Sequence, residues 1–542
     1  MLSCAPVLSG AESPWDPAVS TLIDREINTA LATRKTTPSE LASDTELLRR
    51  VSLDLIGRIP TAAETAAFLA DNSPHKRDKL IDTYLTHEEL PAYWRLVLHQ
   101  WLNNSLPEQG AGEAEFLEYL QQALTTNRPW DVITREILLP DNTDPNSKHA
   151  AYFLAVRLNG DKETRIDNLT TGVSSFFFGV QLQCAKCHDH PQIESWKQDH
   201  YYGLAAFFGR LEPFKGKTTS GVKERADGEL TFVTTKKEEK RAKLLFLDDK
   251  VFDEPAPPDD KNAWYTKGAD DRPDMPFFSR RQVLVDHAIR SDSPFFKRAI
   301  VNRLWFQLMG RGLVEPVDQM HEANPATHPQ LLTALADDFA ASGFNLRRLI
   351  AGIVHSQAYQ RSSQWTGNGE RPAETTYATG VLKPLSPQQL ATSVAVASGQ
   401  YQLFLQKLER EKQNRKLTEI TPAIARAQFQ RDREVQDFSL RFANSGERFE
   451  TNAGQALFLA YNGLFVKQLE AVGGNLTERL TKHKAPAAAV QEAYLTILSR
   501  PPTADEETAG VEFLSAEEPT AKVLCRDFVW SLLCSSEFRL NH

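Results

Sequence analysis

The stretch Asp44–Glu64, DTELLRRVSLDLIGRIPTAAE, predicts two helices joined by a tight turn. The first helix is marked by an apolar stripe at helical spacing, made of Leu47, Leu48, Val51 and Leu55. Gly57 ends this stripe, as expected of the residue just past a helix end. Thr61 and Glu64 stand three positions apart and predict a capping box, in which their side chains accept hydrogen bonds from free backbone N–H groups of the next helix.

A similar stretch lies near the C-terminus. The matching residues are Leu53, Leu55, Ile56, Arg58, Pro60, Thr61, Ala62 and Glu64 in the first copy, and Leu495, Ile497, Leu498, Arg500, Pro502, Thr503, Ala504 and Glu506 in the second. The match covers about fourteen residues at each end of the chain, which is too little for a solenoid repeat. We interpret it as one helix-turn-helix arrangement used at both ends of the fold.

Helical patterns fill most of the chain on either side of residues 212–275. That segment is rich in Lys, Asp and Pro, and it contains two short β-type runs, Leu230–Thr234 and Leu244–Leu247. We therefore predict a mainly α, multi-helical two-domain protein with a small β insertion between the halves. The predicted units are a helical domain at residues 15–211, the β insertion and linker at 212–275, and a helical partner domain at 276–542.

The composition is that of a folded globular protein. The chain has 542 residues, of which 41% are hydrophobic and 25% charged. It holds 62 Lys and Arg against 71 Asp and Glu, so its net charge of −9 creates no general attraction for nucleic acid. Its apolar runs are far shorter than the roughly 18 residues needed to cross a bilayer. We predict no nucleic-acid partner and no transmembrane segment.

Five cysteines are too few and too unevenly placed for a disulfide framework. Cys184 and Cys187 form a tight pair and indicate one local chemical site. Cys525 and Cys534 fall in a C-terminal helical pattern, where buried free cysteines behave as small hydrophobic residues. Cys4 stands near the start without the basic and apolar regions of a signal peptide before it, so no signal peptide is visible in this sequence.

The segment Cys184–His188, CAKCH, is a C-x-x-C-H pattern, which is typical of covalent attachment of c-type haem. The two thiols, Cys184 and Cys187, are spaced to add to the two vinyl groups of one porphyrin. The adjacent His188 would present its imidazole to the iron as the proximal axial ligand. The pattern therefore predicts one haem c site, with His188 as the residue that binds the metal.

Other uses of the same residues stay open. Zinc is the main alternative, with His188 or His190 and a distant ligand completing the site. A zinc finger through His200 fails, because residues 204–206 hold no histidine where its fourth ligand would stand. A thioredoxin-type redox pair needs a strand-helix context that this mainly helical region lacks. Buried structural cysteines without a ligand are the remaining interpretation.

Longer motifs around this site resemble a known family. They are Arg50–Thr61, Gly179–Pro191, Trp196, Gln198 and Tyr201–Phe208. This region closely resembles the planctomycete cytochrome-like domain of unknown function. The second half is similar to the partner domain that usually follows it, on the motifs Asn302–Trp305, Gly310–Val314, Asn324–Pro325, His328–Pro329 and Ser536–His542.

The resemblance implies an exported protein, in the periplasm or at the cell surface, with haem c inferred from the C-x-x-C-H. It also implies a place beside sulfatase-like partners in polysaccharide-degrading bacteria. This sequence departs from the family pattern at His200, where an acidic residue is common, and at Gln319–His321, where an Asp-aromatic pair is common.

The sixth iron ligand would decide the chemistry of a bound haem. A Met or His there gives an electron carrier, whereas an open position allows small-molecule or peroxide chemistry. His190 is too close to His188 to reach the opposite haem face, so we expect it to form hydrogen bonds around the site. The distant candidates are Met309, Met320, His321, His328 and His355, of which His328 fits a family motif.

Three functions follow from these observations. The leading prediction is an exported c-type haem protein that transfers electrons to a redox or sulfatase-like partner in polysaccharide or sulfated-glycan degradation. The first alternative is an accessory binding protein that holds zinc or no metal. The second is a haem oxidoreductase with an open iron position. Whether the chain is an enzyme stays open, since it contains no P-loop, no dinucleotide fingerprint and no Ser-His-Asp order.

Overall fold

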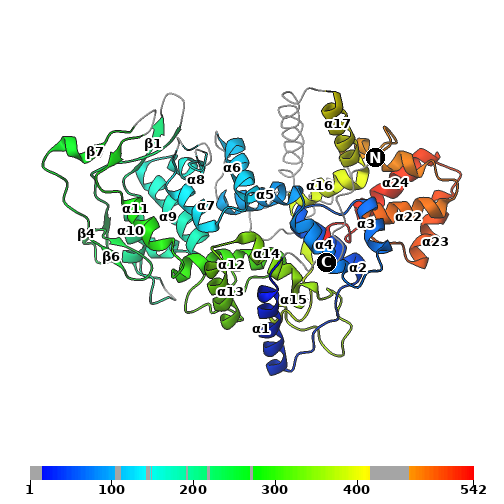
Figure 1. The fold of residues 1–542 in the computed structure, drawn as a ribbon, viewed down its shortest axis with the longest axis horizontal. Helices are drawn as coiled ribbons and strands as arrows, with labels where there is room; N and C mark the ends of the chain where they lie inside the picture. Colours follow the sequence, from blue (N-terminus) through cyan, green and yellow to red (C-terminus); the bar gives the residue numbers. More distant parts are fainter. Residues whose placement is uncertain are drawn as a thin grey trace.

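Helices make up most of the structure, and strands occur only as short antiparallel pairs, as the sequence predicts. The computed structural model describes residues 15–103, 112–141, 144, 147, 149–190, 193–215, 220–268, 273–414 and 463–542. The strand pairs of the insertion gather at one end of the molecule, and α22–α24 (Pro486–Ile497, Ala504–Leu514 and Ala521–Leu533) lie at the other (Figure 1). Within these ranges, no helix has both the length and the apolar character needed to cross a lipid bilayer.

The N-terminal half is helical, and both ends of α2 (Asp44–Ile56) lie where local signals predict. Its helices are α1 (Ala18–Arg34), α2, α3 (Ala62–Ala70), α4 (Lys76–Leu85), α5 (Glu89–Asn103), α6 (Glu113–Thr125), α7 (Trp130–Leu138), α8 (Tyr152–Ala155), α9 (Lys162–Phe178) and α10 (Gln198–Ala206), with 3₁₀ helices η1 (Val156–Leu158) and η2 (Gln183–Lys186). In α2, the Ser43 hydroxyl accepts a hydrogen bond from the backbone N–H of Glu46. Gly57 then ends the helix with a φ of +71°, a conformation that favours glycine.

The β insertion consists of hairpin-like pairs. Its strands are β1 (Leu211–Lys215), β2 (Ser220–Glu224), β3 (Thr231–Val233), β4 (Glu239–Arg241), β5 (Leu244–Leu245), β6 (Val251–Phe252), β7 (Tyr265–Thr266) and β8 (Met275–Pro276), with the 3₁₀ helix η3 (Lys261–Trp264). The strands form four separate antiparallel pairs: β1 with β2, β3 with β4, β5 with β6, and β7 with β8. Strands β3 and β5 confirm the two β-type runs predicted from the sequence.

The C-terminal half is again helical. Its elements are α11 (Arg280–Ala288), α12 (Pro294–Met309), α13 (Pro329–Ala341), α14 (Leu346–His355), α15 (Gln357–Gln360), η4 (Glu374–Thr376), β9 (Lys383–Pro384), α16 (Pro387–Ser398), α17 (Gln400–Asn414), α20 (Gly463–Gln468), α21 (Leu476–Leu480), α22, α23, α24 and β10 (Leu540–Asn541). Strand β10 pairs with β9. The predicted core cysteines both belong to the end of this half: Cys525 is buried in α24, and Cys534, just after it, is half-buried, and both are free thiols.

The two similar stretches form the same structure at both ends of the chain. In the first, Thr61 and Glu64 make the predicted capping box at the start of α3. Arg58, in the preceding turn, donates two hydrogen bonds to the Glu64 carboxylate, at 2.9 and 3.0 Å. It also donates to Glu89, at the start of α5, at 2.8 Å. One guanidinium therefore fixes the turn and ties it to a third segment.

The second copy repeats this arrangement. Thr503 and Glu506 form the capping box of α23. Arg500 donates two hydrogen bonds to Glu506, at 2.7 and 2.8 Å, and two to Glu537, at 2.6 and 2.7 Å. The two copies also match outside the similar stretches. In each, the arginine donates to a second carboxylate, Glu89 after α4 and Glu537 after α24. The helices α2–α4 and α22–α24 are therefore two copies of one three-helix module, called here the first and second modules.

Two hydrophobic cores hold the molecule together. The larger core combines buried residues from both halves, between Val19 and Ala378. The smaller core lies between Leu385 and Phe538, and Leu53 and Ile59 of the first half join it. The α2 region contributes to both cores. It can do so because the helix is buried on most of its circumference.

A buried polar cluster links α2 to the C-terminal end of the chain, which lies beside it (Figure 1). Asp54 accepts hydrogen bonds from the Tyr359 hydroxyl at 2.9 Å, from the Lys383 ammonium at 2.7 Å and from the Asn541 amide at 2.8 Å. Burial raises the pKa of Asp54 against the opposing effect of Lys383, and it lowers the pKa of Lys383. The cluster thus joins four segments that are distant in sequence.

Candidate functional site

The C-x-x-C-H segment forms an exposed loop after α9. Helix α9 ends at Gly179, whose φ of +67° turns the chain out of the helix. The short helix η2 then carries Cys184, and Cys187 follows it directly. Both cysteines are exposed free thiols, and His188 is exposed as well. The structure thus places the three residues of the predicted haem site together on the surface of the molecule.

Gln198 holds this loop in shape. It is the first residue of α10 and is buried. Its side-chain amide donates hydrogen bonds to the backbone carbonyls of Cys187 at 3.1 Å and Lys186 at 3.4 Å. Its backbone N–H donates to the Asp189 carboxylate at 3.1 Å. Sequence reasoning missed this role, because Gln198 drew attention only as part of a longer family motif.

The His188 ring is oriented by the neighbouring backbone. Its Nδ1 lies 2.7 Å from the carbonyl oxygen of Asp189. A carbonyl oxygen only accepts hydrogen bonds, so this contact favours the tautomer with the proton on Nδ1 and leaves the Nε2 lone pair for a metal. Two accessible thiols for the thioether bonds and one imidazole with a free Nε2 lone pair for the iron are what attachment of c-type haem needs. The residues present therefore fit haem c.

A loop from the second half of the chain packs against the end of α9 and the residues that lead from it to the C-x-x-C-H loop. The backbone N–H of Met320 donates to the carbonyl of Gly179 at 2.9 Å. A Cβ at Gly179 would stand 3.0 Å from the Met320 sulfur, a tight contact, and the positive φ at this position also favours glycine. Asp318 accepts hydrogen bonds from Ser175 at 2.8 Å and from Gln181 at 2.7 Å. Of the distant iron-ligand candidates, Met320 is thus brought against Gly179, at the end of the helix that leads to the C-x-x-C-H loop.

His190 lies next to His321 rather than alone. Their ring centroids are 6.4 Å apart, and the backbone N–H of His190 donates to the carbonyl of Trp196 at 2.8 Å. Burial lowers the pKa of His321, with Glu322 opposing the shift and His190 adding to it. The Nδ1 of His321 is buried and has no hydrogen-bond partner among the described residues. The two halves of the chain therefore bring a pair of imidazoles to the edge of the motif.

The other histidine and methionine candidates lie elsewhere. His328 is buried at the start of α13, with its ring 5.4 Å from that of Tyr377. His355 lies 3.1 Å from Asp82 and 3.5 Å from Asp78, both on α4. Met309 is buried at the end of α12. None of the contacts described for these residues reaches the segment from Cys184 to His188.

We expect His328 to make the stability of the protein depend on pH. Burial lowers its pKa from 6.5 to about 4, so the folded state favours the neutral ring. The unfolded chain binds a proton below pH 6.5, and stability is therefore lost as the pH falls from 6.5 towards 4, by up to about 1.4 kcal/mol per pH unit. Urea unfolding of wild type and His328→Asn across this range measures the difference.

The expected result is a shallower loss of stability in His328→Asn than in wild type. His75→Asn is the control, because the His75 side chain is 77% exposed and its loss should leave the slope unchanged. Equal slopes in wild type and His328→Asn would contradict the assignment.

The described residues offer no group of ligands for the alternative zinc site. Across the described ranges, no group of three or more His, Cys, Asp or Glu side chains is arranged to hold a metal ion. His200 instead accepts a hydrogen bond at Nδ1 from the backbone of Lys197, at 3.2 Å, and contacts Asp249 through Nε2 at 2.9 Å. It joins α10 to the β insertion.

Comparison with known families places these features in two domains. Residues 22–212 match a family model described as "Protein of unknown function (DUF1549)", and residues 280–514 match one described as "Protein of unknown function (DUF1553)". The chain resembles a two-domain protein of unknown function. No curated protein and no solved structure matches it. The C-x-x-C-H loop lies in the first matched region, whereas Met320 and His321 lie in the second, so the candidate site combines residues of both regions.

Proposed function

We propose that this protein is an exported c-type haem protein that transfers electrons. Cys184 and Cys187 are the thioether anchors, and His188 is the proximal ligand. The observation that carries the proposal is that both thiols are free and exposed on one short loop, directly before an imidazole whose Nδ1 contacts a backbone carbonyl. A redox or sulfatase-like protein is the electron partner that the family resemblance suggests.

Ligand number favours haem over zinc. A structural zinc ion needs four protein ligands, and the described residues contain no group of even three. Haem brings the porphyrin nitrogens with it, so the protein must supply only the anchors and the axial ligands. The Cys184–His188 loop supplies both anchors and one of the axial ligands.

The surroundings of the loop suit electron transfer. Haem supplies one-electron redox chemistry when it is bound. Gln198 fixes the loop backbone, while the exposed position of Cys184 and Cys187 keeps the attachment point at the surface. A partner protein can therefore approach without any rearrangement of the fold.

The test is covalent haem on the mature protein. The full chain is produced in cells with a competent c-type assembly system, denatured, separated on a gel and stained for haem peroxidase activity. We expect wild type to stain, Cys184→Ala to stain far more weakly, and Cys184→Ala/Cys187→Ala to lose the stain. Cys525→Ala is the matched control, because Cys525 is buried in the smaller core, and it should stain like wild type. Wild-type protein without stain would overturn the proposal.

The spectrum of the haem-loaded protein should depend on the loop that carries Met320 and His321. Of the ligand candidates, Met320 lies against Gly179 and His321 beside His190. We expect Met320→Ala or His321→Ala to shift the reduced visible spectrum and to permit carbon monoxide binding, because an axial ligand is removed. His355→Ala should do neither, since His355 contacts Asp78 and Asp82. Unchanged spectra in both loop variants, with haem still attached, would place the sixth ligand elsewhere.

A further inference from the structure

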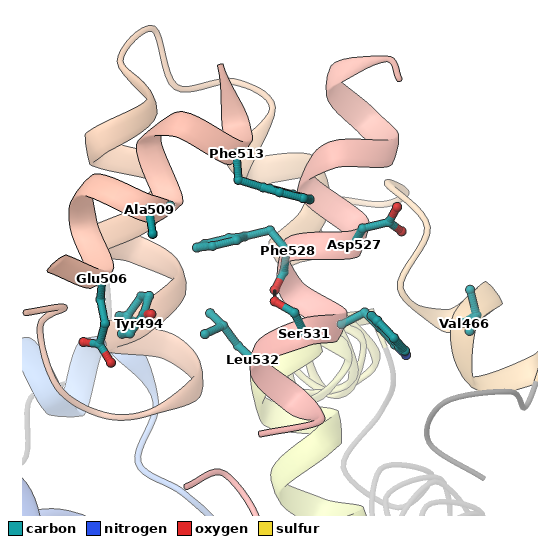
Figure 2. A pocket seen from close by; sticks show the side chains of 11 residues that line it. Val466, Tyr494, Glu506, Ala509, Phe513, Asp527, Phe528, Ser531 and Leu532 are labelled. Atoms are coloured by element: carbon teal, nitrogen blue, oxygen red, sulfur yellow. Dashed lines mark hydrogen bonds between the residues drawn. The ribbon is translucent and has the colours of Figure 1, made fainter. Parts of the chain in front are cut away.

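The second module contains an open groove between its helices. It has a volume of about 660 Å³ and is lined by side chains of α22, α23 and α24 together with Val466 of α20. Most of the lining is apolar, and its aromatic members are Tyr494, Phe513, Phe528 and Trp530. Figure 2 shows Phe513 and Phe528 facing each other from neighbouring helices, and their ring centroids are 6.1 Å apart. Phe513 is 42% exposed, which is unusual for so large an apolar side chain.

The first module differs from the second at this place. When Arg58 is aligned with Arg500, Phe68 of α3 corresponds to Gly510 of α23. Phe68 is buried, with the Lys76 ammonium 5.0 Å from its ring centroid. Gly510 has no side chain and lines the groove together with Ala509. A Cβ at Gly510 would stand only 2.8 Å from Val490, so the helices approach closely at this point, and the groove opens beside it at the exposed Ala509 and Phe513.

Helix α23, beside the groove, and the four residues that follow it are strongly acidic. Residues 504–518 contain no Lys or Arg and six carboxylates: Asp505, Glu506, Glu507, Glu512, Glu517 and Glu518. Among the described residues, Arg500 pairs with Glu506, and no guanidinium pairs with the other five. Asp505, Glu512, Glu517 and Glu518 are exposed. On the opposite side, Arg526 pairs with Asp527 at 2.8 Å. The groove thus has an apolar floor and a negatively charged edge.

We propose that this groove binds a cationic amphipathic helix of a partner protein. The apolar face of such a helix would cover Phe513 and Phe528, and its Lys or Arg residues would meet the carboxylates of α23. Docking of an amphipathic helix in an apolar groove is a common mode of recognition, and opposite charges at the rim select and steer the partner. A second copy of this chain suits the groove poorly, because its net charge of −9 and acidic α23 would repel the same surface.

The test uses the full-length protein and a defined probe. A fluorescently labelled helical peptide of leucine and lysine is titrated with protein, and its anisotropy is measured. We expect saturable binding that weakens as salt is added, because exposed charges are screened. Ala509→Phe should weaken binding by about tenfold or more by filling the groove. The matched control is Ala67→Phe, the same change at the corresponding exposed position of the first module, and it should bind like wild type.

Other results would overturn the proposal. These are no binding of the leucine-lysine peptide to wild type, or equal binding of a twin peptide with glutamate or glutamine in place of lysine. Self-association that Ala509→Phe abolishes would instead assign the groove to a second copy of the chain. Phe513→Ser provides a second variant should Ala509→Phe fail to fold, since Phe513 is exposed, and it too should weaken peptide binding.

Discussion

Asp54→Ala is expected to lower the free energy of unfolding by about 3–5 kcal/mol, because it leaves a buried ammonium without its counter-charge. Among the described residues, Lys383 is held by both oxygens of Asp54, at 2.7 and 2.8 Å, and by two backbone carbonyls. The Tyr359 hydroxyl and the Asn541 amide lose the same acceptor. Since these partners come from distant segments, the loss should appear as a lower midpoint of cooperative urea unfolding.

The control on the same helix is Asp44→Ala. Asp44 pairs with Lys76 and Arg77 near the surface, where such pairs contribute about 1 kcal/mol or less. The double variant Asp54→Ala/Lys383→Met should regain part of the lost stability, because the buried charge is removed with its partner. A double variant as unstable as the single one would show that the uncompensated Lys383 charge is not the cause.

Gly57→Ala is expected to destabilise the protein by about 2–5 kcal/mol, for two reasons that add. The φ of +71° at Gly57 is unfavourable for any residue with a side chain. A Cβ at this position would also overlap the ring of Tyr93, which is itself buried in the larger core. The measurement is equilibrium unfolding in urea, with the enthalpy followed by calorimetry.

Gly343→Ala separates the two causes. Gly343 has the same φ of +71°, but a Cβ there meets no atom within 4 Å. Its substitution should cost only the conformational part, about 1–2 kcal/mol. If both variants lowered the free energy of unfolding equally, the overlap with Tyr93 would contribute nothing to it, contrary to the prediction.

The local features of this protein follow from residues a few positions apart. The capping boxes at Thr61 and Thr503, and the helix end at Gly57, were predicted correctly because their hydrogen bonds form within one turn of chain. The mainly α class follows in the same way from helical periodicity. The C-x-x-C-H could be recognised because its spacing is itself the signal, and its assignment to haem stays a prediction.

The sequence alone thus determined the helices, the duplicated turn and the position of the candidate haem site. Only the tertiary structure decided which distant residues surround them: Gln198 under the Cys187 carbonyl, Met320 against Gly179, and Asp54 against Lys383. It also decided that Leu53 and Ile59 join a core formed mainly by the other end of the chain. The physical reason is that local hydrogen bonds depend on neighbouring residues, whereas these contacts exist only once whole helices have packed.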